Sequence, residues 1–224
     1  MREVAIDTET TGLDPAAGHR IVEIACVEMV NHVPTGTEFH HYVNPQRAMP
    51  AEAFAIHGLG DDFLAGFGTF DAIAEPFLDF IAESPLVIHN ADFDLKFINA
   101  ELARVDREPI DRARAIDTLA IARRKYPGAQ ASLDALCKRF EIDLSSRDKH
   151  GALIDTQLLA AVYLELIGGR QPGLELTALQ ARQADSTAAT ARPRRAPRPH
   201  APTADESAAH DAFLDKLDSP IWRC

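Results

Sequence analysis

Two carboxylates stand two residues apart where the first apolar segment of the chain ends. Asp7 and Glu9 follow Val4-Ala5-Ile6 and precede Thr10-Thr11-Gly12. Alternate side chains of a strand project to one face, so these carboxylates lie side by side and repel each other unless a cation lies between them. Carboxylate oxygens suit Mg²⁺ or Mn²⁺. The alternative is that Asp7 caps a turn and Glu9 is solvated.

A third carboxylate, Asp94, lies where a short apolar strand over 86–88 passes into a helix. Phe93 and Phe97 are four residues apart, a spacing that would anchor one face of the helix in the core. Asp94 then falls in the first helical turn, near the sheet edge where ligands commonly bind in α/β proteins. The alternative, which we assign to Asp92, is a carboxylate that only complements the helix dipole.

A fourth carboxylate, Asp155, lies early in a helix over 152–167, and His150 precedes it by five residues. A single histidine is more often structural or solvent-facing. Placed just before a helical carboxylate, however, His150 would reach a water bound near the same cation. Its near-neutral pKa suits it to take a proton from that water.

The segments that must position these residues predict an α/β fold. Three short-linked strand-like segments, 4–7, 21–30 and 39–43, suggest an antiparallel meander, with Pro34-Thr35-Gly36 as a turn. Strands and helices then alternate, which predicts a mixed sheet covered by helices. The expected elements are a helix over 70–81, a strand over 86–88, a helix over 92–102, a strand ending near 116, and helices over 118–125, 133–140 and 152–167.

Composition narrows the class of protein. The 224 residues carry 34 acidic and 23 basic side chains and a formal charge of −11, unlike a protein that coats long duplex DNA. No apolar run approaches the ~20 residues of a membrane span, and no signal peptide is recognisable. Three scattered cysteines, without CxxC spacing, indicate reduced thiols in a cytoplasmic protein and no zinc site.

Taken together, the segments Ile6–Leu13, His89–Asp94 and His150–Asp155 resemble the DEDDh branch of the DEDD 3′–5′ exonucleases. The resemblance covers residues 2–169 and implies an RNase H-like fold. It implies that Asp7, Glu9, Asp94 and Asp155 bind two divalent metal ions, Mg²⁺ or Mn²⁺, and that His150 acts as general base. We expect Asp7, Glu9 and Asp155 to hold one ion, with Asp7 bridging to a second ion on which Asp94 acts through water.

Within that family, two further segments are similar to the proofreading subunits of bacterial DNA polymerase III. They are Asp155–Gly169 and Glu52–Gly58. The similarity implies that Glu52 and His57, with Asp7, Glu9 and Asp155, contact the terminal nucleotide of a DNA 3′ end, single-stranded or frayed. The alternative for Glu52 and His57 is an acid on a helix surface and a histidine in a turn.

Beyond the exonuclease domain, 1–170, the composition predicts a flexible linker, 171–208, and a polymerase-binding C-terminal segment, 209–224. Gln171, Leu174 and Leu176 resemble the peptides that dock on bacterial sliding clamps. The C-terminal segment is expected to bind the polymerase alpha subunit, and a small theta-like subunit is a further candidate partner. The residues expected at the polymerase contact are Phe213, Leu217 and Trp222.

Two other functions compete with proofreading. One is a DEDDh ribonuclease, such as an oligoribonuclease, which would use the same chemistry on RNA. The other is a non-catalytic structural subunit of a polymerase complex, which the presence of all four carboxylates and His150 disfavours.

Overall fold

The computed structural model describes residues 1–144, 150–168 and 201–218. The chain divides into two units, Met1–Gln171 and Pro172–Cys224. In the second unit the described residues contain one helix, α9 (Ala204–Leu214). No helix within the described ranges combines the length and apolar character that crossing a bilayer requires.

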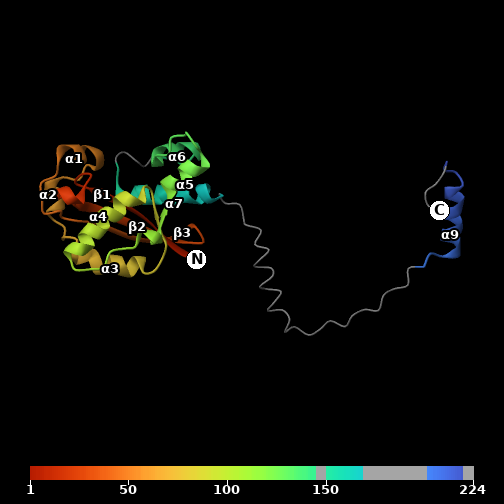
Figure 1. Ribbon diagram of the computed structural model, residues 1–224, viewed down its shortest axis with the longest axis horizontal. Coiled ribbons are helices and arrows are strands. Elements are labelled where there is room, and N and C mark those ends of the chain that lie inside the picture. The colour runs from red at the N-terminus through yellow and green to blue at the C-terminus, as the bar shows by residue number, and fades with distance from the viewer. Residues whose placement is uncertain (145–149, 169–200, 219–224) are drawn as a thin grey trace, which may run out of the picture. The chain divides into compact units, whose positions relative to one another are not determined.

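The first unit is built on a five-stranded mixed sheet with the order β3-β2-β1-β4-β5 (Figure 1). The first three strands pair antiparallel, whereas β4 and β5 run parallel to β1. The predicted meander followed by β/α alternation is therefore confirmed. The strands are β1 (Arg2–Thr10), β2 (Ile21–Val30), β3 (Val33–Tyr42), β4 (Leu86–Ile88) and β5 (Ala115–Asp117).

The turn between β2 and β3 is not where the sequence placed it. Asn31 and His32 make the turn, with φ of 52° and 67°. A two-residue hairpin loop with both φ values positive matches the right-handed twist of the strands. Pro34-Thr35-Gly36 instead lies inside β3, where the register with β2 shifts between Val27 and Met29. The prediction was wrong because Pro and Gly also occur at strand irregularities.

Most helices agree with the predicted segments to within a few residues, and α5 and α7 have the predicted bounds. Sequence analysis did not predict α1 or α2, which contain only seven and four residues. Short helices present too few turns for a periodic apolar pattern. The helices are α1 (Ala51–His57), α2 (Asp61–Leu64), α3 (Asp71–Ile81), α4 (Ala91–Arg104), α5 (Thr118–Lys125), α6 (Leu133–Arg139) and α7 (Ala152–Ile167), with 3₁₀ turns η1 (Pro15–Ala17) and η2 (Arg112–Arg114).

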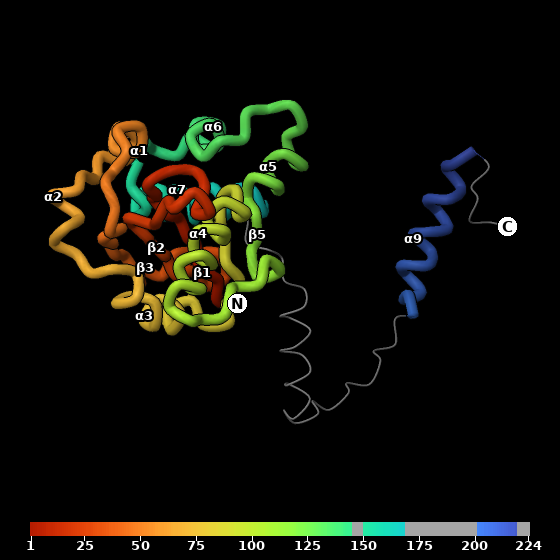
Figure 2. Tube along the Cα trace, turned by 60° about the vertical axis from the view of Figure 1, so that its left-hand side comes forward, coloured from red at the N-terminus to blue at the C-terminus, as the bar shows by residue number. Residues whose placement is uncertain are grey.

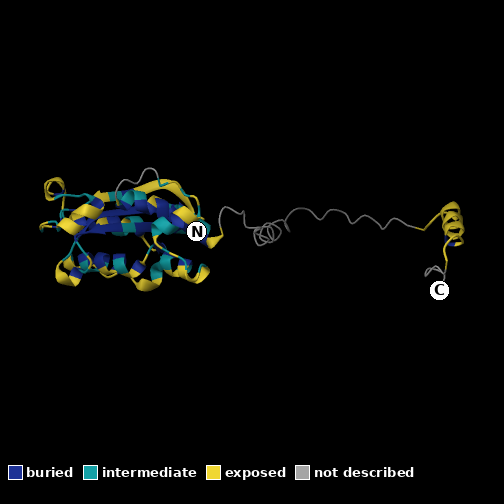
Figure 3. Cartoon of the chain, turned by 90° about the horizontal axis from the view of Figure 1, so that it is seen from above, coloured by how far each residue is buried: buried dark blue, intermediate teal, exposed yellow. Residues whose placement is uncertain are grey.

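Helices cover both faces of the sheet, and the buried residues lie between the layers (Figure 3). Val4 and Ile6 of β1 share one core cluster with residues of α3 and α4. Ala5 of the same strand belongs to a second cluster with Leu159 and Tyr163 of α7. Odd-numbered residues of β1 therefore face α7, and even-numbered residues face α4.

This alternation continues as far as Glu9, and the register with β2 shifts between Glu9 and Thr10. The pairing of β4 with β1 ends at Ile6 and Ile88, so Asp7, Thr8 and Glu9 extend past the last residue of β4. Asp7 and Glu9 lie on the α7 side of the strand, and Thr8 lies on the α4 side. The two helices that begin at this edge, α4 and α7, can therefore both bring side chains to the end of one strand.

Candidate active site

Asp94 reaches β1 from the first turn of α4. The backbone N–H of Thr8 donates to its Oδ1 over 3.1 Å, and the Thr8 hydroxyl donates to the same oxygen over 2.7 Å. These bonds replace the strand pairing that β4 no longer supplies. Asn90, in the left-handed conformation with φ 68°, turns the chain from β4 into the helix. The position of Asp94 is thus set by the short length of β4.

Asp155 and His150 come to the same strand end from the start of α7. The His150 Nδ1 lies 3.2 Å from the Asp155 Oδ2. Ligand atoms of Glu9, His150 and Asp155 all lie within 4.8 Å of one another. The carboxylates of Glu9 and Asp155 are buried, whereas the His150 side chain is half exposed. The buried carboxylates of Glu9 on β1 and Asp155 on α7 are therefore close to each other and to the half-exposed imidazole of His150.

The carboxylates at this edge repel one another electrostatically when they are ionised. The pKa of Asp7 is raised well above its usual range, by burial first and then by the charges of Asp94, Glu9 and Asp155. Burial also raises the pKa of Asp94 to about 7, although the donors of Thr8 oppose the shift. Four acidic side chains from three segments thus form one electrostatic group, and a divalent cation is the natural neutraliser of such oxygen ligands.

Some of these acids line two separate cavities. One, of about 440 Å³, is lined by Asp7, His150 and Asp155 together with His89 and Arg123. The other, of about 560 Å³, is lined by Glu9 together with Glu52 and His57 of α1. The structure therefore brings both α1 residues to the cavity that holds one of the predicted metal ligands.

His57 is buried at the end of α1. Its Nδ1 accepts a hydrogen bond from the backbone N–H of Leu59 over 3.0 Å. In the neutral ring the proton then resides on Nε2, which makes that atom a donor. Glu52 is exposed in the first turn of the same helix. The α1 pair thus offers one donor and one acceptor.

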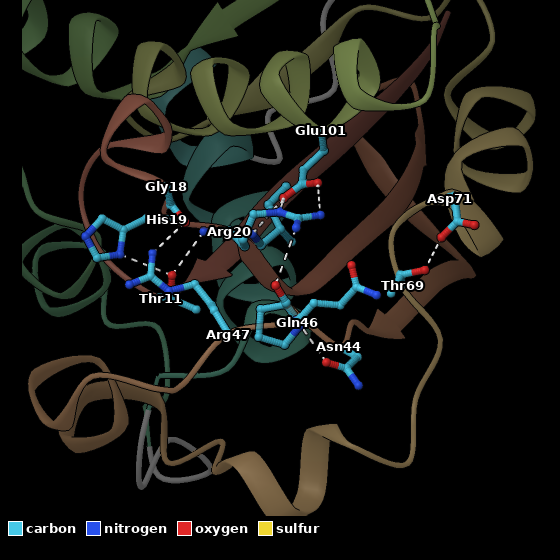
Figure 4. Close-up of polar contacts among 12 residues, drawn as sticks. Thr11, Gly18, His19, Arg20, Asn44, Gln46, Arg47, Thr69, Asp71 and Glu101 are labelled. Atoms are coloured by element: carbon cyan, nitrogen blue, oxygen red, sulfur yellow. Dashed lines mark hydrogen bonds and ion pairs between the residues drawn. The ribbon is translucent and has the colours of Figure 1, made fainter.

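The loop that follows Glu9 is held by a polar network (Figure 4). The Thr11 hydroxyl accepts from the backbone N–H of Arg20 over 3.0 Å and lies 3.1 Å from the His19 Nδ1. Arg20 binds both carboxylate oxygens of Glu101 over 2.6 and 2.7 Å. A Cβ at Gly12 would lie 2.3 Å from the His19 ring, so any larger residue there would force that ring to move. This network fixes one wall of the larger cavity.

Other acids near the site have structural partners. Asp117 accepts from the backbone N–H groups of Leu119 and Ala120 and caps α5. Asp92, exposed in the first turn of α4, pairs with Arg112.

Sequence analysis did not identify Thr8, whose two bonds orient Asp94, nor Arg123 in the wall of the smaller cavity. Thr8 lies between Asp7 and Glu9, and this position was the one signal available for it.

Some of the residues predicted to bind partners are not described by the structure, and others belong to the second unit. Gln171, Leu174, Leu176 and Trp222 fall outside the described residues. In the second unit, Phe213 and Leu217 are both exposed. Helix α9 begins at Ala204, inside the predicted linker 171–208. It begins there because the side chains of Thr203 and Glu206 form a capping box.

Fold and carboxylates together define a nuclease of the DEDDh type, and the exonuclease family model RNase T matches residues 4–163. The chain belongs to this exonuclease family. It is 55% identical over 179 residues to the DNA polymerase III subunit epsilon of Rickettsia conorii, covering 79% of this chain and 78% of that protein. It is 42% identical over 236 residues to the subunit of the same name from Escherichia coli, covering 99% and 97%.

Solved exonucleases share the fold. Exonuclease X in complex with 5′ overhanging duplex DNA aligns with a TM-score of 0.58 and 28% identity, covering 73% of this chain and 90% of that one. The nuclease domain of 3′hExo, a DEDDh family member bound to rAMP, aligns with a TM-score of 0.65 and 21% identity, covering 78% and 94%. The predicted RNase H-like fold is confirmed, and divalent metal ions are the cofactors that this family implies.

Proposed function

We propose that this protein is the 3′–5′ proofreading exonuclease of a bacterial DNA polymerase III, removing nucleotides from the 3′ end of DNA. The observation that carries the proposal is the convergence of Asp7, Glu9, Asp94 and Asp155 at one end of β1. The relatives named DNA polymerase III subunit epsilon support the assignment to replication, since one of them matches nearly the whole chain. A proofreading subunit of this kind acts in the cytoplasm.

The acids fit a site for two ions, Mg²⁺ or Mn²⁺. Asp7, Glu9 and Asp155 would hold one, with Asp7 shared with a second on which Asp94 acts. Two such ions supply an activated water and neutralise the leaving oxygen of a phosphodiester. The raised pKa of Asp7 and of Asp94 supports this donor set, because a bound cation relieves the repulsion that raises them.

His150 is suited to the proton transfer. A neutral ring that donates its Nδ1–H to Asp155 carries its lone pair on Nε2, which then takes the proton of the attacking water. Half exposure of the side chain lets the proton pass on to solvent. General base catalysis of this kind contributes about 10²–10⁴-fold to the rate.

Glu52 and His57 would hold the terminal nucleotide. Both line the cavity that contains Glu9, and the Nε2–H of His57 is a donor for a sugar or phosphate oxygen. We expect an unpaired end to enter this cavity and reach the acids. A mismatched end frays more readily than a matched one, and the lower cost of unpairing it favours removal of errors.

Residues from Gln171 onward would attach the enzyme to its partners. Phe213 is 57% exposed on α9, an apolar side chain suited to bury against the polymerase alpha subunit together with Leu217 and Trp222. Gln171, Leu174 and Leu176 would contact a sliding clamp, and a small theta-like subunit is a third candidate. Deleting residues 201–224 should abolish co-elution with the polymerase subunit and preserve nuclease activity.

The test compares two acids of one helical turn. Asp94→Ala should abolish degradation of a single-stranded DNA oligonucleotide in Mg²⁺ or Mn²⁺, whereas Asp92→Ala, the matched control, should retain it. Circular dichroism checks that both variants fold. Full activity of Asp94→Ala would refute the site.

Two results with the parent chain would favour the competing functions. A much higher rate on RNA than on DNA would assign the protein to the DEDDh ribonucleases. Absence of nuclease activity would assign it to structural subunits.

A further inference from the structure

A strongly basic surface interrupts this acidic protein. Residues 118–139, which span α5, α6 and the loop between them, contain five basic side chains and one acidic side chain, Asp134, in a chain of net charge −11. All five basic residues are exposed. We call them the α5–α6 basic surface: Arg123, Arg124, Lys125, Lys138 and Arg139.

Packing holds the two helices of this surface together. Ala122 of α5 and Leu136 of α6 share a core cluster with Val162 of α7. The Arg139 guanidinium lies 4.4 Å from the centroid of the Tyr126 ring, which bridges the two helices. Figure 2 shows α5 and α6 as neighbouring segments at one edge of the first unit. The two helices that carry the basic residues are therefore neighbours in the fold.

The basic residues of this surface differ in whether they have a protein partner among the described residues. Lys125 donates to the backbone oxygen of Leu166 over 2.8 Å, at the end of α7. Within the described ranges, by contrast, no carboxylate forms an ion pair with Arg123, Arg124 or Lys138. Exposed cations without an acidic partner are available to an anionic ligand.

The surface begins at the wall of the active site. Arg123 lines the same cavity as Asp7, His150 and Asp155, and Ser132, which caps α6, lines it too. A strand that leaves the acids through this cavity therefore meets Arg123 first. Arg124 follows it on α5, and the cations of α6 lie on the helix that Ser132 begins.

We propose that the α5–α6 basic surface binds the phosphates of the DNA strand behind the nucleotide that is being removed. This inference rests on the proposed function and specifies how that site holds its substrate. The acids at the end of β1 repel phosphates, so the strand needs cations nearby, and this surface supplies them next to the cavity. Its ligand is a single-stranded polynucleotide bound through its backbone, without base readout.

The experiment uses the full chain with Arg124→Glu and Lys138→Glu combined, because neither residue lines the active-site cavities. Arg104→Glu with Arg107→Glu is the control, since both are exposed, lie on or just beyond the C-terminal end of α4 away from Asp94, and change the net charge equally. kcat and KM are measured on a thymidine dinucleotide and on an oligothymidylate of about 16 nucleotides, the upper end of known single-strand site sizes.

The α5–α6 variant should raise KM for the long oligonucleotide by about tenfold at low salt and leave both constants for the dinucleotide unchanged. The slope of log KM against log salt should fall by about 1.4, since each phosphate contact contributes about 0.7. The control should match the parent chain on both substrates.

Three results would overturn the inference: an unchanged KM for the long oligonucleotide, an equal rise in KM for both substrates, or an equal rise in the control. Polyglutamate that competes with the long oligonucleotide as well as polythymidylate does would assign the surface to an acidic protein instead. Failure of the proposed function would look different, because the parent chain would then hydrolyse neither substrate.

Discussion

Strand β1 and helix α7 pack against each other and carry buried carboxylates at both ends. At one end, Asp7 and Glu9 lie with Asp155, and burial and mutual repulsion raise the pKa of Asp7. At the other end, Glu3 is also buried, but it accepts a hydrogen bond from the Tyr163 hydroxyl over 2.8 Å and lies 2.6 Å from the His32 Nδ1. Acids lie together at one end, and at the other end a single buried acid accepts a hydrogen bond from Tyr163.

The two ends are linked by geometry. Four residues of β1 separate Glu3 from Asp7, about 13 Å of extended chain. Eight residues of α7 separate Asp155 from Tyr163, about 12 Å of helix. Because these lengths match, the bond between Glu3 and Tyr163 holds strand and helix in the register that brings Asp155 to Asp7. The Glu3–Tyr163 end contributes stability, and acids that repel one another are concentrated at the end proposed to hold the metal ions.

The largest effect should come from the site end. His150→Ala should lower kcat for oligonucleotide hydrolysis by about 10²–10⁴-fold, because the water loses its general base. The unfolding midpoint in urea should barely change, since the side chain is half exposed. A fall in unfolding free energy large enough to account for the lower kcat would contradict a catalytic role for His150.

A second effect is the pH dependence of the metal-free chain. Asp94 has a pKa of about 7 when folded, against 3.8 for its usual value, so the folded state binds an extra proton between these values. Stability should therefore fall as the pH rises from about 4 to about 7, by an amount on the order of 1.4 kcal/mol for each unit of pKa difference lost. Urea unfolding at each pH measures it.

Asp94→Asn serves as the control for that measurement. The Asn side chain keeps an oxygen for the two donors of Thr8 but does not titrate. The fall in stability over this pH interval should be smaller in the variant. An identical fall in both proteins would show that other groups cause it.

A smaller effect should come from the Glu3–Tyr163 end. Tyr163→Phe removes a donor from the buried carboxylate of Glu3 and should cost about 1–3 kcal/mol of unfolding free energy. Burial, followed by the bond to Glu3, raises the pKa of the Tyr163 hydroxyl, so it donates as a neutral group. Tyr126→Phe, which keeps the ring beneath Arg139, is the matched control and should be nearly neutral. Equal costs in the two variants would contradict the role assigned to Glu3.

The sequence predicted the site end far better than the Glu3–Tyr163 end. The bounds of α7 follow from a regular apolar face, and the carboxylates stood out because their types and local spacing suit a cation. Glu3 and Tyr163 are 160 residues apart, and neither has a local pattern that indicates the other. The Asn31–His32 turn was missed for a different reason, since Pro34 and Gly36 nearby favour a turn equally well.

We expect the acids at the end of β1 to repel one another until divalent cations bind. Thermal unfolding of the parent chain and of Asp7→Asn, each with and without Mg²⁺, measures this repulsion. Asp7→Asn should melt at a higher temperature than the parent without metal and should gain less from Mg²⁺. A variant that melts at a lower temperature without metal, and gains as much from Mg²⁺ as the parent does, would contradict this expectation.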